Sequence, residues 1–397
     1  MSANTDTTAP AGARQPWLRV AAALAMAAWG ANQFVPMLLV YRAERGLPET
    51  LVTAMFAAYV LGMVPTLLGG AWFSQRHGRR LMVRISVVLM AVASLLLLAG
   101  ADVPALLFAG RIVAGAGVGF AMGAGSAWVS ALSSDRPAGT GARRAALAMT
   151  AGFGLGPILA GALAQWVPAP LQLPYAVHLV LQTLAAVAVW NAPEPRPETT
   201  ALLRLGAVAE TVRHQWFWTI VLPSAPWVFG TVAVAFAVVP SVTGPLPGLP
   251  VVFAAGAAAG IALGTSALVQ PLLRRWASGH AATLILIGMG TVALGMLMAM
   301  ASALWPASWW LPVIAVVLGS CHALLIVGCM TLVELNSPPG LLAPMTAIVY
   351  CLAYIGFTAP WVVALLALVV PAWVALLVGA VVAVATTAWL VRCRRRG

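Results

Sequence analysis

Arg76-His77-Gly78-Arg79-Arg80 is the stretch of sequence that decides the fold. Three arginines and a glycine here separate two long apolar runs, 51–73 and 82–100. Glycine adopts the backbone conformations of tight turns without steric cost, and arginines gather beside apolar segments at one surface of a membrane. The stretch therefore predicts a short loop at a membrane surface that joins two spanning helices.

The composition of the whole chain agrees with a membrane protein. Hydrophobic residues make up 62% of the 397 positions and charged residues 8%, whereas a soluble domain is about one quarter charged. The lipid bilayer is therefore the first expected partner. The net charge of +12 comes from arginines alone, and these stand at the ends of apolar segments rather than on one face, so we expect no nucleic acid partner.

The cysteines and the known enzyme motifs exclude other classes of site. The four cysteines have neither CxxC pairing nor zinc-ligand spacing, so we expect no metal site; they are Cys321, Cys329, Cys351 and Cys393. The sequence has no P-loop, no HExxH helix and no nucleophile with a nearby base. We therefore expect neither an enzyme nor an ATP-driven pump, and no cofactor.

The apolar runs predict an all-α integral membrane protein of twelve transmembrane helices. A helix needs about 20 apolar residues to cross the hydrocarbon. Only Val370-Pro371 separates the last two runs, so an eleven-span alternative, with the termini on opposite sides, stays open. The twelve expected spans are 17–41, 51–73, 82–100, 104–132, 145–167, 173–192, 216–240, 250–272, 281–301, 309–333, 342–367 and 371–391.

The arginines predict the orientation of these spans. With twelve spans and an inner N-terminus, eighteen arginines lie in inner segments, and only Arg42 and Arg45 lie in outer loops. Positive charge is retained on the cytoplasmic side of a membrane. We therefore expect a multi-pass protein of the plasma (inner) membrane with both termini in the cytoplasm.

The spans divide into two pseudo-symmetric six-helix bundles. The polar stretch 191–215 separates six spans from six, and Gly152-Phe153 followed by Pro157 in the fifth span is echoed by Gly356-Phe357 followed by Pro360 in the eleventh. Such echoes are typical of two repeats related by an axis along the membrane normal. The expected parts are an N-terminal tail (1–16), a first bundle (17–192), a central cytoplasmic linker (193–215), a second bundle (216–391) and an Arg-rich tail (392–397).

Three motifs resemble those of the major facilitator superfamily, and the likeness covers essentially the whole chain. Arg76, Gly78, Arg79 and Arg80 match the signature loop of that family after the second span, although Gln75 replaces its usual aspartate. The run 111–117 in the fourth span is similar to the intramembrane arginine motif of the family. The run 152–161 in the fifth span resembles the Gly-Pro motif of its exporters, many of which are drug/proton antiporters.

The resemblance implies a secondary active transporter that works by alternating access. It favours export of a small organic or drug-like molecule in exchange for protons. We also expect the protein to be a monomer. An importer or facilitator of a small metabolite stays open as an alternative, as does a carrier-like membrane sensor that transports nothing.

Three residues inside the spans are candidates for coupling transport to an ion. Arg111 costs about 2.5–3.5 kcal/mol to insert, so it should face a polar cavity or a partner. The resemblance gives it a coupling role, and pairing with helix-end carbonyls is the structural alternative. All nine acids lie in tails, in loops or at span ends. His322 in the tenth span, and then His178 in the sixth, are therefore the candidate proton carriers, unless they serve only in packing.

Glycines, a proline and loop charges are the candidates for gating. Gly152 and Gly156 allow close helix approach, and Pro157 kinks a helix; with Gly161 they form either a gate or ordinary packing. We further expect Arg79 or Arg80 to pair with Asp135 when the inner gate is closed. The alternative is that the loop charges, Arg76 among them, only set the topology.

The substrate site is expected between the halves, near the midplane of the membrane. Asn32 and Gln33 are polar groups at a suitable depth in the first span. Trp29, Phe34 and Trp227 could stack on an aromatic ligand, although helix packing explains them equally well. Because no acid is buried, we expect a neutral, zwitterionic or anionic hydrophobic substrate.

Overall fold

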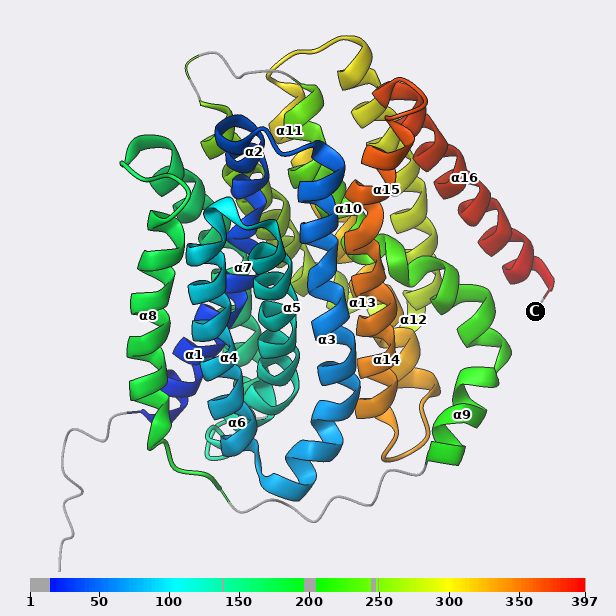
Figure 1. Cartoon of the computed structure of the whole chain (residues 1–397). Helices are drawn as coiled ribbons and strands as arrows, with labels where there is room; N and C mark the ends of the chain where they lie inside the picture. The colour runs from blue at the N-terminus through cyan, green and yellow to red at the C-terminus, as the bar shows by residue number, and fades with distance from the viewer. Residues whose placement is uncertain (1–14, 138, 196–204, 244–247, 249, 397) are drawn as a thin grey trace, which may run out of the picture.

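Helices build the whole computed structural model (Figure 1), which describes residues 15–137, 139–195, 205–243, 248 and 250–396. The described part contains no strand. Short 3₁₀ turns lie at Gly100–Asp102 and Gly356–Thr358, and π-helical turns at Ala121–Gly125 and Phe217–Val221. The α-helices are α1 (Pro16–Asn32), α2 (Phe34–Arg45), α3 (Glu49–His77), α4 (Arg79–Ala99), α5 (Pro104–Phe120), α6 (Ser126–Ala131), α7 (Thr140–Trp166), α8 (Leu173–Trp190), α9 (Leu205–Arg213), α10 (Leu222–Ala237), α11 (Val239–Val242), α12 (Val251–Leu304), α13 (Trp310–Asn336), α14 (Leu342–Ile355), α15 (Ala359–Leu366) and α16 (Ala372–Arg396).

The described chain has eleven helical stretches that are long and apolar enough to cross a membrane. One of them, α12, has 54 residues, which at about 1.5 Å per residue far exceeds the roughly 30 Å of hydrocarbon. His280 has non-helical backbone angles (φ −136°, ψ 19°) and divides α12 into two helices. These two helices correspond to the expected spans 250–272 and 281–301, so the prediction of twelve spans is confirmed.

The two halves repeat each other in their helix packing. Within the halves, α1 packs on α7 as α10 packs on α14, and α3 packs on α5 as α12 packs on α13. Between the halves, α7 contacts α12, and α3 contacts α14. These pairs exchange under a pseudo-two-fold axis, which confirms the predicted pair of six-helix bundles.

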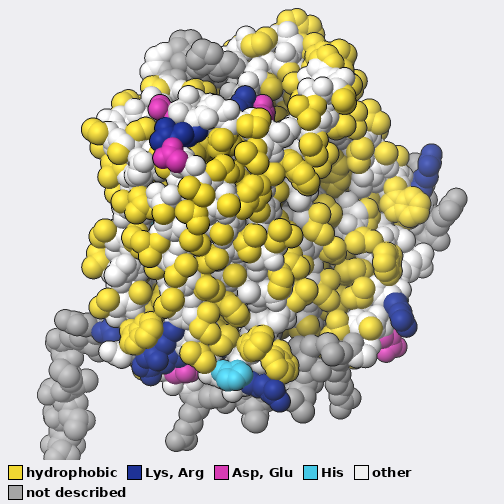
Figure 2. All heavy atoms as spheres, in the orientation of Figure 1, with side chains coloured by type: hydrophobic (Ala, Val, Ile, Leu, Met, Phe, Trp, Pro, Cys, Tyr) yellow, Lys and Arg dark blue, Asp and Glu magenta, His cyan; other side chains and the backbone are white. Residues whose placement is uncertain are grey.

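Apolar side chains cover most of the outer surface between the two ends of the helices. In the view of Figure 2 the front of the molecule is a hydrophobic band, with charged side chains above and below it. Large apolar side chains such as Val187 (72% exposed) and Leu268 (77% exposed) point outward. Water would not solvate such a surface favourably, so these residues face lipid in a multi-pass membrane protein.

The loop at Arg76–Arg80 joins α3 to α4 on the side of the molecule where α1 begins, which we call the terminal side; the opposite side is the far side (Figure 1). Gly78 has φ +86°, which favours glycine, and a Cβ there would collide with the carboxylate of Glu194. Glu194 Oε1 accepts hydrogen bonds from the backbone N–H groups of Arg79 (2.6 Å) and Arg80 (3.1 Å). A carboxylate therefore caps the positive end of α4.

Two segments outside the spans differ from the expected tails and linker. The segment 193–215, expected as a linker, contains the helix α9, and residues 196–204 lie outside the described part. At the C-terminus, α16 continues to Arg396 through the segment that was expected as a tail. The expected tail 1–16 lies almost wholly outside the described residues.

Candidate functional site

A central cavity of about 460 Å³ lies between the two halves. Helices α1, α6 and α7 line it from the first half, and α10, α12, α13 and α14 line it from the second. It extends from Asn32 and Phe357 inside the molecule to Ala127, Ala142 and Arg274 toward the terminal side. Both halves therefore contribute to one internal site.

The polar groups of the cavity are almost all uncharged. Arg274 is the one charged residue among the described residues that line it, and no acid lies there. No carboxylate of the described part lies within ion-pairing distance of Arg274. The cavity therefore offers a positive mouth and a neutral interior. Its uncharged polar lining consists of Asn32, Ser126, Ser130, Thr150, Ser266, Gln270, His322, Thr346, Tyr350 and Tyr354.

His322 is the most distinctive of these polar groups. Its imidazole is buried, with 7% exposed, and Nδ1 lies 2.6 Å from the hydroxyl of Ser266. Gln270 Nε2 donates to the same hydroxyl at 3.0 Å, which leaves the hydroxyl proton of Ser266 free to donate to Nδ1. When this hydroxyl donates to Nδ1, the proton of the neutral ring lies on Nε2, and Nε2 has no hydrogen-bond partner. A buried N–H donor without an acceptor is costly, so this atom is available to a ligand.

An aromatic layer closes the cavity at its inner end. It consists of Phe56, Tyr59, Phe229, Phe236, Tyr354 and Phe357, and the two halves meet in it. Phe56 of α3 meets Phe357 edge-on, with ring centroids 5.2 Å apart, and Phe229 stacks on Tyr354 at 4.2 Å. Contacts of this kind are worth about 0.5–1.5 kcal/mol each beyond their buried area. The layer therefore holds the halves together next to the cavity.

Arg111 lies behind this layer and not in the cavity. It is 1% exposed, Nη1 donates to the carbonyl of Ala31 at 2.8 Å, and Nη2 donates more weakly to Phe56 O at 3.4 Å. Its guanidinium carbon lies 4.8 Å from the ring centre of Tyr59 and 4.9 Å from that of Phe34. Ala31 lies two residues before the break between α1 and α2 at Gln33, so a helix-end carbonyl and aromatic faces, rather than a carboxylate, hold this charge.

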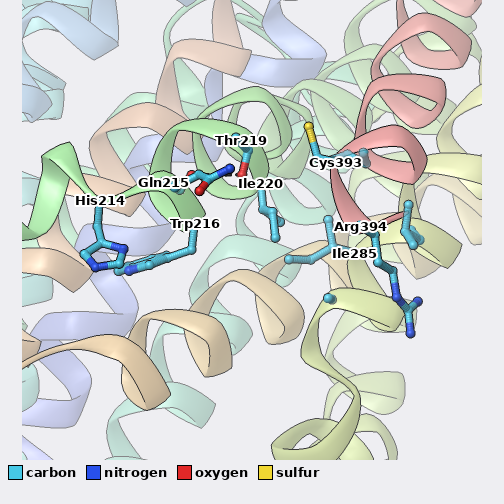
Figure 3. A pocket seen from close by; sticks show the side chains of 11 residues that line it. His214, Gln215, Trp216, Thr219, Ile220, Ile285, Cys393 and Arg394 are labelled. Atoms are coloured by element: carbon cyan, nitrogen blue, oxygen red, sulfur yellow. Dashed lines mark hydrogen bonds between the residues drawn. The ribbon is translucent and has the colours of Figure 1, made fainter. Parts of the chain in front are cut away.

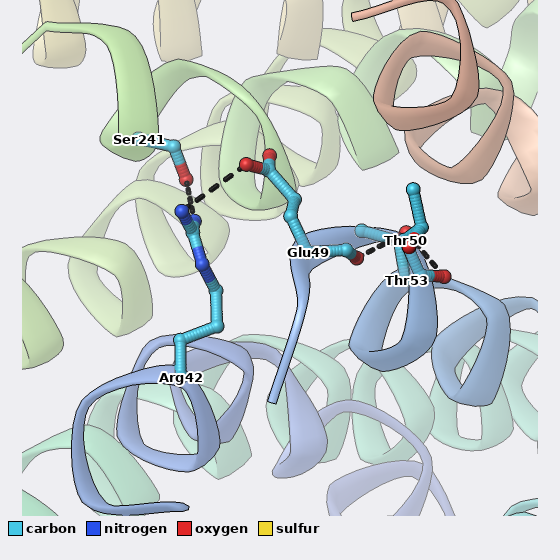
Figure 4. Close-up of polar contacts among 5 residues, drawn as sticks. All are labelled: Arg42, Glu49, Thr50, Thr53 and Ser241. Carbon is cyan, nitrogen blue, oxygen red and sulfur yellow. Dashed lines mark hydrogen bonds and ion pairs between the residues drawn. The ribbon is translucent and has the colours of Figure 1, made fainter. Parts of the chain in front are cut away.

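A polar contact closes the far side of the molecule (Figure 4). Arg42 at the end of α2 pairs with Glu49 at the start of α3, at 3.1 Å. The same guanidinium donates to the hydroxyl of Ser241 in α11, also at 3.1 Å, and Ser241 belongs to the second half. The hydroxyl of Thr53 donates to Glu49 O at 2.6 Å and fixes the first turn of α3. Arg42 therefore bridges the halves beyond the aromatic layer.

Pro157 explains the position of Asn32. A proline has no N–H, so Pro157 leaves the carbonyl of Phe153, four residues earlier in α7, without its helical donor. Asn32 Nδ2 donates to this carbonyl at 3.2 Å. Asn32 therefore lines the cavity and also satisfies the backbone gap that Pro157 creates.

This pairing gives a double-mutant prediction. Asn32→Leu should lower the melting temperature in detergent, because an unsatisfied buried carbonyl costs about 1–3 kcal/mol. In the Pro157→Ala background the same substitution should cost much less, because the introduced alanine supplies the missing N–H. Equal losses in both backgrounds would contradict the assignment of Asn32 to this carbonyl.

The glycines of α7 pack against two different helices. A Cβ on Gly152 would collide with the backbone oxygen of Ala25, and one on Gly156 would collide with the backbone of Trp29, both in α1. Gly161 lies against the backbone of Val252 in α12, where a Cβ would be 3.1 Å from the carbonyl oxygen. The predicted Gly-Pro run therefore lies between α1 of its own half and α12 of the other.

His178 is fully buried outside the cavity lining, with both ring nitrogens hydrogen-bonded. Nδ1 lies 2.7 Å from the hydroxyl of Ser94, and Nε2 lies 2.9 Å from the carbonyl of Met26. A coupling role for His178 stays a prediction, and its contacts are those of the packing alternative.

The loop arginines do not contact Asp135 in this structure. Asp135 pairs with its neighbour Arg136 at 3.3 Å. The side chain of Arg80 donates to Trp190 O at the end of α8, and that of Arg76 lies over the ring of Trp72 at 4.7 Å. The expected pairing concerns a closed inner gate, so it stays a prediction.

Of the five predicted substrate-binding residues, only Asn32 lines the cavity. Trp29 packs beside His178, Phe34 beside Arg111, and Gln33 is buried at the α1–α2 break. Trp227 lines a hollow within the second half. In this state these four residues therefore do not meet at one site.

Several lining residues that were not predicted have a spacing along the sequence that is a usable signal. Ser266, Gln270 and Arg274 recur every four residues along an otherwise apolar span, as do Tyr350 and Tyr354 in the eleventh span. Residues four apart lie on one face of a helix. Polar stripes of this kind indicate the face that turns away from lipid.

A second hollow, of about 390 Å³, lies between the segment 214–220, α12 and the C-terminal part of α16 (Figure 3). His214, Trp216, Ile285, Cys393 and Arg394 are among the residues that line it. Because no residue of the first half contributes, this hollow cannot connect the two sides of the interface between the halves.

Comparison with known proteins gives one family and several similar folds. The family model described as Major Facilitator Superfamily matches residues 20–301. No curated protein matches the chain. A solved structure of a mutant of the nucleoside transporter NupG has a TM-score of 0.73 at 12% identity, with 95% of this chain and 99% of that chain covered.

Two further solved structures are similar to the chain over nearly their whole lengths. One is a D-xylose-proton symporter, with a TM-score of 0.68 at 17% identity and coverage of 93% of this chain and 96% of that one. The other is the inward-open xylose transporter XylE from E. coli, with a TM-score of 0.69 at 15% identity and coverage of 93% and 94%. At these identities the similarity shows the fold alone, and none of the three supports the predicted export or antiport.

Proposed function

The chain belongs to the Major Facilitator Superfamily, and on that premise we propose that it carries a small organic molecule across a membrane by alternating access through the central cavity. The observation that supports this most is the position of the cavity. Both halves line it, the aromatic layer and Arg42 close it on the far side, and it extends toward the terminal side. A site of this kind can be exposed to each side of the membrane in turn.

With the termini in the cytoplasm, as the arginines predict, the described state faces inward. In the outward-facing state the Arg42–Ser241 contact and the contacts between the two halves of the aromatic layer separate. The loop arginines and Asp135 then approach the second half or each other on the inner side. The protein acts as a monomer in the plasma membrane in this proposal.

Proton coupling is the finer part of the proposal, and His322 is the residue that supports it. It is the one histidine that lines the cavity among the described residues, and histidine changes its charge near neutral pH. Export in exchange for protons, as the Gly-Pro run suggested, and import together with protons both remain compatible with a proton on this ring. The direction of transport is therefore part of the test.

Transport by purified protein in proteoliposomes tests the proposal with a matched pair of variants. Ala146 lines the cavity on α7, and the adjacent Leu147 is 63% exposed on the outer surface. A tryptophan at position 146 fills part of the cavity, whereas a tryptophan at position 147 projects into lipid. With a panel of dyes, aromatic acids, nucleosides and sugars, with and without a pH gradient, we expect Ala146→Trp to abolish movement that Leu147→Trp preserves.

Two results would contradict alternating access through this cavity. One is equal transport by both variants. The other is binding of a panel compound with no movement across the bilayer, which would support the carrier-like sensor instead.

A further inference from the structure

His322 and the groups around it suit a particular class of substrate. Nε2 of this ring is buried without a hydrogen-bond partner, and it is a donor whenever Ser266 donates to Nδ1 or the ring is protonated. The ring of Phe229 lies 5.1 Å from the imidazole between centroids. Phe229 in turn stacks on Tyr354 at an interplanar angle of 20°. A hydrogen-bond donor therefore stands beside a flat aromatic surface in one corner of the cavity. A planar ligand that carries an acceptor group fits both features.

The charges around His322 favour an anionic acceptor. Of the helices packed on α13, α12 presents Arg274 toward the cavity, and α14 presents Tyr350 and Tyr354. The described parts of α10 and α11 present no titratable group there. No described acid lines the cavity, and its one full charge among the described residues is positive; Glu334 of α13 lines an adjoining hollow, which Gln270 and Arg274 also line. An isolated anion loses its hydration in such a cavity at a high cost unless a positive partner compensates it.

The partners of the His322 ring tolerate its protonation. In the neutral ring Nδ1 accepts a hydrogen bond from Ser266, whose hydroxyl in turn accepts one from Gln270. When Nδ1 gains a proton, Ser266 can accept from it instead, because a hydroxyl both donates and accepts. The carboxamide of Gln270 also carries both a donor and an acceptor, so a rotation of the amide restores its bond to Ser266.

Resting on the proposed carrier function, we propose that the cavity binds a small aromatic carboxylate together with one proton, which His322 holds on Nδ1. The carboxylate of the ligand accepts from Nε2–H, and its aromatic body lies against Phe229. The proton comes from water on the side to which the cavity is open. The imidazolium and the carboxylate stabilise each other, because either charge alone is costly in the buried site.

This pairing requires the anion and the proton to travel in the same direction. When the site is protonated and empty, no anion balances the imidazolium. When it is loaded and unprotonated, no cation balances the carboxylate. The favoured occupied state is therefore the neutral pair, and its passage moves no net charge. Arg274 at the mouth attracts the anion toward the cavity before it binds.

Calorimetric titration of the purified protein tests the proposal with two pairs of probes. Benzoate is compared with benzamide, and indole-3-acetate with indole-3-acetamide, each in two buffers that differ in ionisation enthalpy. We expect at least one carboxylate to bind about tenfold or more tightly than its amide, since hydrogen bonds to charged groups are the stronger ones. The apparent binding enthalpy of that carboxylate should differ between the two buffers by the difference in their ionisation enthalpies, which corresponds to the uptake of one proton per ligand.

Substitution of His322 distinguishes its binding of a proton from its hydrogen bond to the carboxylate of the ligand. The glutamine side chain in His322→Gln keeps a donor for the carboxylate and cannot take up a proton. We expect weaker binding without proton uptake, whereas the affinity of the wild-type protein falls up to about tenfold per pH unit as the pH rises. The exposed His280, substituted as His280→Gln, is the matched control and should behave as wild type.

Three outcomes would overturn the proposal. They are equal affinity for amides and carboxylates, carboxylate binding without proton uptake, and binding of no carboxylate in the panel. The carrier function is judged separately. If Ala146→Trp blocks the transport of a neutral compound that wild type moves, the carrier function stands although the anion–proton pair does not.

Discussion

Gly152→Leu is expected to prevent the accumulation of folded protein. A Cβ at this position collides with the backbone oxygen of Ala25, and with the methyl group of Ala28. Backbone of a packed helix cannot rotate aside as a side chain can, so the cost should reach the upper end of the range for overpacking, about 3 kcal/mol or more. That is a large share of the roughly 5–15 kcal/mol that stabilises a typical protein.

The same helix provides a matched control for this substitution. Gly154 lies two residues further along α7, and no atom lies within 4 Å of a Cβ built there. Gly154→Leu should therefore leave the yield of monodisperse protein and its melting temperature in detergent close to wild type. Size-exclusion chromatography and thermal unfolding of both variants make the comparison. Equal yields would show that α1 and α7 do not need this close approach.

The spans and their grouping were predictable because apolar length and arginine position follow directly from the bilayer. The faces of the helices were harder to predict. A span such as α10 has only two polar side chains, Ser224 and Thr231, and its sequence does not say whether Trp227 or Phe229 faces the cavity. The aromatic prediction for this span is Trp227, whereas Phe229 lines the cavity. The rotation of such a helix depends on its neighbours, which a single sequence does not reveal.

The polar residues of the site were likewise predictable only in part. Asn32 and His322 could be identified because an isolated polar group in an apolar span needs a partner. Their partners could not be identified, because Phe153 O and Ser266 are brought to them by packing between helices far apart in the sequence. Arg111 was recognised as exceptional, and the structure supplies its surroundings: backbone carbonyls and three aromatic rings.

Arg111→Met is expected to weaken the closed far side while it preserves the fold. The substitution removes a buried charge that has no carboxylate partner, which is a favourable change, and it leaves Ala31 O without a donor, which is unfavourable. We therefore expect a melting temperature close to wild type. The rings of Phe56 and Tyr59, however, lose the guanidinium behind them. Cation–π contacts are worth about 0.5–2 kcal/mol each, so the population of the closed layer should fall about tenfold for each 1.4 kcal/mol lost.

Spin labels across the far side can measure this shift. Glu44 in α2 and Val251 at the start of α12 are both exposed and belong to different halves. In a cysteine-free background, labels at these positions should give one short distance when Arg111 is present and an added longer population in the Arg111→Met variant. Arg111→Lys keeps the charge but lacks the planar fork, so its distances should be intermediate. An unchanged distribution in the methionine variant would show that Arg111 does not support closure.

Arg111 carries a buried positive charge with which no acid of the described residues forms an ion pair, so the membrane potential acts on it. Moving one elementary charge through the whole voltage drop of a membrane is worth about 2.3 kcal/mol per 100 mV. If Arg111 shifts through one tenth of that drop as the halves rock, a potential of 100 mV tilts the equilibrium by only about 0.2 kcal/mol. Ala31 O and the rings that hold the guanidinium all belong to its own half of the molecule. A tilt of that size is small beside the cation–π contacts of about 0.5–2 kcal/mol each that hold the guanidinium.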